Sequence, residues 1–151
     1  MHRLLIGVAN SPLRDLLFAI LMADGHEVVA MANGLDLLDT LAVSLQPECG
    51  PGKFDLVIAE TRMLGKGEAV VFGELGRRAR LPPFVFIVSF GDKELQAKMK
   101  QFGALAMVDT PLDIDNLREI VNSSLDRLAE ERGSAPQVSQ SGVEQMAQSV
   151  A

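Results

Sequence analysis

The residues of this chain that could do chemistry stand where short apolar runs end. These positions are Ala9 and Asn10; Glu60, Thr61 and Arg62; Ser89; and Asp109, Thr110 and Pro111. They offer the carboxylate of Glu60 and several hydroxyls, which suit cation binding or proton transfer, but no histidine and no lysine. Ser89 has no nearby histidine and no G-x-S-x-G motif, and the glycines around Lys66 lack the spacing of a phosphate-binding loop. The set therefore argues against a hydrolase or a phosphate-loop enzyme.

These positions can meet only if the apolar runs are neighbouring strands. Short runs that suit buried strands alternate with apolar residues at helical spacing. Strands are expected at residues 4–8, 27–31, 54–59, 84–88 and 105–108, and helix faces at 13–21, 35–45, 71–75, 95–102 and 114–128. This alternation predicts an α/β fold: one doubly wound parallel sheet of five strands with five helices. The candidate positions then share the carboxyl edge of the sheet, where such folds place their sites.

Local residue types predict where several helices begin and end. Ser11 before Pro12 is expected to cap the first helix, and Gly25 to end it. Asn33 and Gly34 indicate a turn, and Asp113 is expected to cap the last helix.

Length and composition indicate one domain followed by a tail. The chain has 151 residues, close to the common size of a single domain. Past Arg132 the sequence becomes rich in Ser, Gln and Gly and too poor in apolar residues to form a packed core. We therefore expect a domain over residues 1–132 and a flexible tail over 133–151.

Charge and cysteine content exclude several classes of function. The net charge is −6, and the one basic cluster, at Arg77, Arg78 and Arg80, is small, so nucleic-acid binding is not expected. Cys49 is the only cysteine and there are two histidines, which leaves no disulfide and no His-rich metal cluster. No apolar run reaches the roughly 20 residues that span a bilayer. A cytoplasmic protein without membrane contact is expected.

The order of these elements and three segments resemble a response-regulator receiver domain (CheY-like, flavodoxin-like fold). The segments are residues 55–63 (D-L-V-I-A-E-T-R-M), 90–94 (F-G-D-K-E) and 108–113 (V-D-T-P-L-D). The resemblance covers about residues 3–128. It implies a module of two-component phosphorelay signal transduction that takes a phosphoryl group on an aspartate with the help of Mg²⁺.

The chain departs from that pattern at every functional position except Ser89. The resemblance places Glu60 at the phosphoacceptor aspartate, Ala9 and Asn10 at the acidic pair that holds Mg²⁺, Thr110 at a lysine, Met107 at an aromatic switch residue and Ser89 at the hydroxyl residue. Mg²⁺ prefers carboxylate oxygens, and phosphoryl transfer needs cations to neutralise the charge that develops. We therefore expect the Mg²⁺ site to be lost, with no cofactor and no phosphorylation.

The resulting hypothesis is a degenerate receiver, or pseudo-receiver: a non-enzymatic signalling module that works by contact with a protein partner or a second copy of itself. The alternative is a flavodoxin-like domain that uses the same crevice to bind a small molecule or catalyse a reaction. Glu60 itself has two interpretations, a built-in mimic of the phosphorylated state or a solvated carboxylate. The contact surface is expected to carry Lys98, Lys100, Met107, Asp109 and Arg118.

Overall fold

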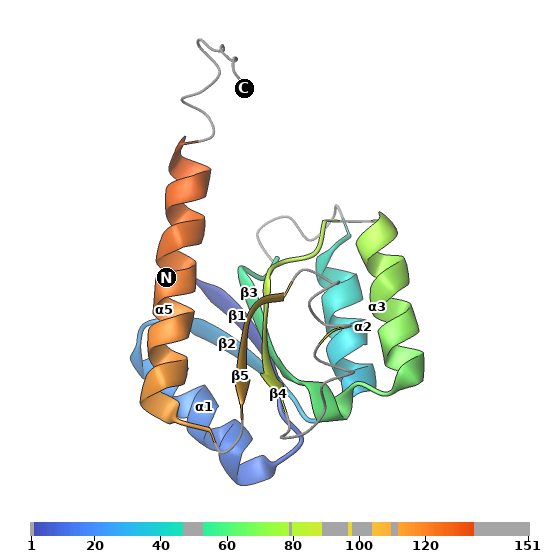
Figure 1. Cartoon of the computed structure of the whole chain (residues 1–151), viewed down its shortest axis with the longest axis horizontal. Helices are drawn as coiled ribbons and strands as arrows, with labels where there is room; N and C mark the ends of the chain where they lie inside the picture. The colour runs from blue at the N-terminus through green and yellow to red at the C-terminus, as the bar shows by residue number, and fades with distance from the viewer. Residues whose placement is uncertain are drawn as a thin grey trace. The chain divides into compact units, whose positions relative to one another are not determined.

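A single parallel sheet forms the centre of the fold (Figure 1). The computed structural model describes residues 2–46, 53–78, 80–88, 97, 104–109 and 112–134. The strands are β1 (Arg3–Gly7), β2 (Glu27–Met31), β3 (Leu56–Glu60), β4 (Phe84–Val88) and β5 (Ala104–Asp109). Their order is β2-β1-β3-β4-β5, so the chain changes direction across the sheet between β1 and β3. The predicted doubly wound sheet is confirmed.

The helices cover both faces of this sheet. They are α1 (Ser11–Ala23), α2 (Gly34–Ser44), the short 3-10 helix η2 (Thr61–Met63), α3 (Lys66–Arg78) and α5 (Ile114–Ser134). Figure 1 shows α1 on one face and α2 with α3 on the other. The helix expected over 95–102 lies, apart from Ala97, outside the described residues. In the described part of the chain no helix is long and apolar enough to cross a membrane.

The chain divides into two compact units, Met1–Arg118 and Glu119–Ala151. The division falls inside α5, so the first unit holds all five strands and the site described below. In the second unit the structure describes α5 as far as Ser134, two residues into the segment expected to be a tail. The remainder of that segment lies outside the described residues, and the boundary at 132 stays a prediction.

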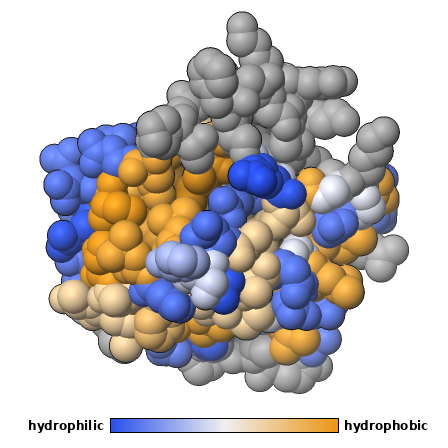
Figure 2. Space-filling view, turned by 90° about the horizontal axis from the view of Figure 1, so that it is seen from below, coloured by the Kyte–Doolittle hydropathy of each residue, from blue (hydrophilic) through white to orange (hydrophobic). Residues whose placement is uncertain are grey.

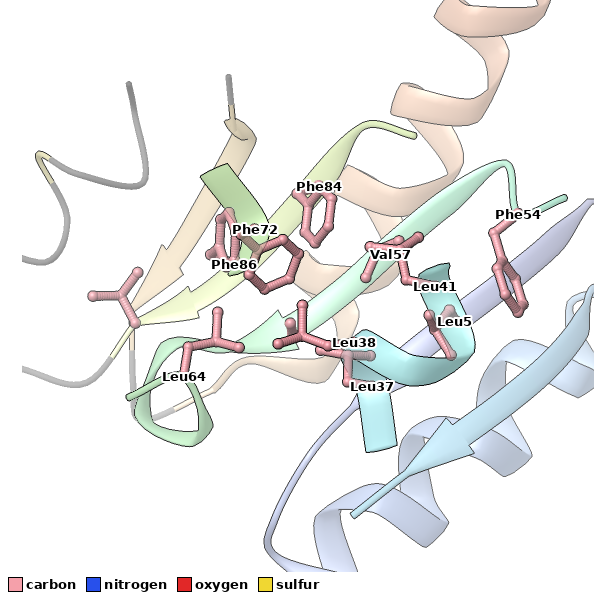
Figure 3. Close-up of a cluster of buried hydrophobic side chains, with 12 residues drawn as sticks. Leu5, Leu37, Leu38, Leu41, Phe54, Val57, Leu64, Phe72, Phe84 and Phe86 are labelled. Atoms are coloured by element: carbon pink, nitrogen blue, oxygen red, sulfur yellow. The ribbon is translucent and has the colours of Figure 1, made fainter. Parts of the chain in front are cut away.

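A cluster of buried side chains joins the sheet to α2 and α3 (Figure 3). Alternate residues of a strand point to opposite faces, so Phe84, Phe86 and Val88 of β4 all face this cluster. Phe84 packs edge-on against Phe72 of α3 and stacks on Phe86, both with ring centroids 5.2 Å apart. Each buried aromatic or aliphatic side chain contributes about 1.5–3 kcal/mol relative to an exposed one. The cluster therefore fixes the carboxyl ends of β3 and β4 against the helices.

The ends of α1 correct one prediction and confirm another. Asn10, not Ser11, caps the helix: it has an extended backbone and its side chain accepts a hydrogen bond from the amide of Leu13, whereas Ser11 is already helical. Gly25 follows the helix with a φ of 93°, the left-handed conformation expected of a terminating glycine.

The predicted turn at Asn33 and Gly34 is corrected, and the predicted cap at Asp113 is confirmed. Asn33 and Gly34 do not form a separate turn, because Asn33 caps α2 by accepting from the amide of Asp36. At the start of α5, the Asp113 side chain accepts from the amide of Asn116 at 3.2 Å, which confirms the predicted cap.

Candidate functional site

Glu60 ends the central strand β3 and is almost fully buried, with 8% of its surface exposed. β1 and β3 are adjacent, and Gly7 lies opposite Ala59, so the loop after β1 passes beside Glu60. The Glu60 Oε1 atom accepts a hydrogen bond from the backbone amide of Ala9 at 2.7 Å. Glu60 is therefore not the solvated carboxylate that one of its two interpretations expected.

The neighbouring positions of the loop, Ala9 and Asn10, offer no free ligand. Ala9 has no side-chain oxygen, and its amide is bonded to Glu60. The Asn10 Oδ1 atom accepts from the amide of Leu13 at 2.9 Å as the cap of α1. Ala9 thus connects the loop to Glu60, and Asn10 stabilises the start of α1.

Arg14 holds the same loop from the other side. Its Nη1 atom donates to the carbonyl of Val8 at 2.9 Å and to that of Ala9 at 3.4 Å. Arg14 was not among the residues expected at the site. The available indication was the only cation of a mostly apolar helix, five and six residues after the two carbonyls that it contacts.

The residue after Glu60 joins β3 to β4. Thr61 is fully buried, and its hydroxyl donates to the carbonyl of Ile87 at 3.3 Å. Arg62 is exposed. Hydrogen bonds of Glu60 and Thr61 thus connect β3 to the loop after β1 on one side and to β4 on the other.

Solved structures match this arrangement, although no protein-family model and no curated protein matches the sequence. A response regulator receiver domain protein from Clostridium thermocellum has a TM-score of 0.69 at 17% identity, covering 85% of this chain and 98% of that one. A CheY-like receiver domain protein from Methanospirillum hungatei gives 0.71 at 18% identity, with 87% and 98% covered. The chain has the fold of a response-regulator receiver domain. Full-length FixJ from B. japonicum gives 0.69 at 22% identity, covering 92% of this chain and 64% of FixJ.

Within the receiver fold, the structure describes only part of the switch-equivalent set. Ser89 and Thr110 lie outside the described residues, so their expected places in this set stay predictions. Met107 of β5 is partly buried and packs against the hydrophobic cluster of Figure 3. Its side chain is thus shared between the edge of the core and the surface, and its role in the expected contact surface stays a prediction.

Arg118, also expected on the contact surface, keeps 42% of its side chain exposed and forms an ion pair within the chain. Its Nη2 atom lies 2.6 Å from Asp24 Oδ1 and its Nε atom 3.1 Å from Oδ2, a two-point ion pair to the C-cap of α1. The hydrogen bonds to Asp24, and then its charge, raise the pKa of the Arg118 guanidinium above its usual value. Arg118 thus fastens the start of α5 to the end of α1. Lys98, Lys100 and the side chain of Asp109 lie outside the described residues.

The site does not fit the Mg²⁺ that the receiver fold implies. Mg²⁺ needs near-octahedral oxygen ligands, usually with carboxylates among them. Here Ala9 supplies no side-chain oxygen, the Asn10 oxygen caps α1, and one oxygen of Glu60 is bonded to an amide. In the described ranges no group of three or more His, Cys, Asp or Glu side chains could hold a metal ion.

The bond between Glu60 and Ala9 gives a stability prediction. Glu60→Ala is expected to lower the free energy of unfolding by about 1–2 kcal/mol, because a hydrogen bond to a charged group is lost while water reaches the exposed loop. Glu60→Gln keeps an acceptor oxygen and should lose less than half of that. Urea denaturation measures both, with exposed Arg62→Ala as the control, expected to stay within about 0.5 kcal/mol of the natural protein. Equal stability of Glu60→Ala and the natural protein would contradict the bond.

Proposed function

We propose that this chain is a degenerate receiver, a cytoplasmic signalling module that acts by protein–protein contact and without aspartyl phosphorylation or enzymatic activity. The observation that carries the proposal is the 2.7 Å hydrogen bond from the Ala9 amide to the buried Glu60 carboxylate. It engages the phosphoacceptor-equivalent side chain with the loop that would hold the metal in a working receiver. The likeness to receiver structures supports a role in signal transduction.

The chemistry at Glu60 supports this proposal. Phosphoryl transfer to a carboxylate requires an in-line approach and cations that neutralise the equatorial oxygens. A glutamate carboxylate stands one methylene farther from the backbone than that of an aspartate, and here it is directed to the Ala9 amide. Thr110 replaces the lysine of the receiver pattern, so neither source of positive charge is retained.

In this proposal Glu60 acts as a fixed connection between β3 and the loop after β1. A phosphate would carry about −1.5 to −2 charges, more than one carboxylate supplies. Glu60 therefore holds the loop in one arrangement, together with Arg14 on the opposite side of Ala9. The chain would present one constant surface to its partner.

Incubation with acetyl phosphate and Mg²⁺ tests the proposal directly. Intact-mass spectrometry is expected to show no phosphate on the natural protein, and Glu60→Gln serves as the matched control. Addition of one phosphate to the natural protein and not to Glu60→Gln would overturn the proposal. A thermal-shift screen with nucleotides and flavins tests the alternative of a small-molecule-binding domain, which would show as a ligand-dependent rise in Tm.

A further inference from the structure

Helix α1 exposes apolar side chains on the face that it turns away from the sheet. Leu17 and Leu21 are buried, yet Leu16, Phe18 and Met22 are 46%, 39% and 47% exposed. A surface helix ordinarily has a polar outer face, and one that is apolar all round is usually covered. In Figure 2 hydrophobic surface gathers on the side of the molecule where α1 lies.

The exposed face of α1 is nearly symmetric about Ala19. On a helix the residues three and four positions away are the neighbours of a given residue. Leu16 and Met22 stand three positions before and after the exposed Ala19, and Asp15 and Ala23 stand four positions before and after it. A small residue with a larger apolar residue on either side lets two helices cross closely at that point.

Charge also suits a second copy crossing α1 in the antiparallel sense. Asp15 is the only charged residue among the exposed positions of α1, so two chains of net charge −6 meet where little repulsion opposes them. About a twofold axis at Ala19, Asp15 of one copy approaches Ala23 of the other. Ala23 adjoins Asp24, whose carboxylate is already paired with Arg118, so Asp15 approaches a neutral ion pair and not an unpaired like charge.

We propose that α1 is an isologous self-association surface, in which Leu16 contacts Met22 of a second copy and Ala19 contacts Ala19. In a twofold interface each contact between two different residues occurs twice, once in each direction. Here Leu16 would contact Met22 twice, and the two Ala19 residues would contact each other once at the axis. The proposal names a self-contact on α1 and does not depend on whether Glu60 accepts phosphate.

The size of the face sets the expected affinity. A helix of 13 residues is about 20 Å long and about 10 Å across with its side chains. The area of one such helix face is far below the roughly 800 Å² that each partner buries in a standard interface. The dissociation constant of the dimer is therefore expected to lie above about 1 µM.

Sedimentation velocity from about 10 µM to about 500 µM tests the association. The natural protein is expected to pass from monomer toward dimer over this range. Leu16→Glu is expected to weaken association at least tenfold while the protein stays folded, since Leu16 is 46% exposed. Val70→Glu is the matched control, because Val70 on α3 is 67% exposed and lies outside α1. A natural protein that stays monomeric throughout, or equal weakening by both variants, would overturn the proposal.

Cross-linking tests the geometry. In a Cys49→Ser background, Ala19→Cys is expected to form a covalent dimer when diamide oxidises the paired thiols to a disulfide. Val70→Cys in the same background should form little. A covalent dimer with Val70→Cys but not with Ala19→Cys would place the contact elsewhere. Both results are independent of the acetyl phosphate experiment, so failure here leaves the proposed function standing.

Discussion

Restoring four receiver-type residues is expected to make this chain accept a phosphoryl group. The variant combines Ala9→Asp, Asn10→Asp, Glu60→Asp and Thr110→Lys. It supplies carboxylate ligands for Mg²⁺ at the loop after β1 and at the end of β3, and a cation that neutralises the transferred group. Asn10→Asp keeps the cap of α1, since aspartate also accepts from the Leu13 amide. Glu60→Asp removes the contact between this side chain and the Ala9 amide.

Intact-mass spectrometry after treatment with acetyl phosphate measures the outcome. The phosphoryl group passes to the new carboxylate and acetate leaves, so the mass rises by one phosphate, and only when Mg²⁺ is present. The control carries Glu60→Asn in place of Glu60→Asp and should gain nothing. A folded four-residue variant that stays unmodified would mean that these positions alone do not account for the loss of phosphorylation.

The sheet was predictable from the sequence because its inner strands β1, β3 and β4 are buried on both faces and appear as apolar runs. β2 and β4 have the predicted bounds. α3 begins five residues earlier than its apolar face at Val71 suggested, because polar residues and Gly67 form its first turn. Helix propensity alone disfavours glycine there, but the first turn forms few backbone bonds that glycine could weaken.

The position of the site followed from topology, whereas its contacts did not. Parallel strands bring their carboxyl ends together, so Ala9 and Glu60 were correctly expected at one edge. That the Glu60 carboxylate bonds to the Ala9 amide, and that Arg14 reaches back to the same residue, depends on side-chain rotamers and on the exact register of β1 and β3. The ion pair of Arg118 with Asp24 was not predicted for the same reason, since helix periodicity does not reveal a contact between elements distant in the sequence.

Gly34→Ala is expected to destabilise the protein by about 2–3 kcal/mol and to lower Tm by about 10 °C. Gly34 is buried at the start of α2, and a Cβ atom there would lie 2.3 Å from the Met63 carbonyl oxygen and 3.2 Å from the Glu68 side chain. The carbonyl belongs to the backbone of η2 and cannot rotate away, so α2 or η2 must shift. Differential scanning calorimetry and urea denaturation measure the effect.

Gly67→Ala is the matched control, because Gly67 stands in the first turn of α3 and a Cβ atom there meets nothing within 4 Å. It should leave stability unchanged or raise it by up to about 1 kcal/mol. Equal stability of the two variants would mean that α2 and η2 do not approach as closely as the structure has them.

Gly34→Ala is also expected to affect the candidate site, because η2, which must shift, follows Glu60 directly. If the shift of Met63 displaces Glu60, the Ala9 bond is already weakened in Gly34→Ala, and adding Glu60→Ala costs less than it does alone. A double-mutant cycle should then give a coupling of about 0.5–1 kcal/mol between Gly34 and Glu60. Strict additivity would show that the packing behind η2 and the hydrogen bond at its start are independent.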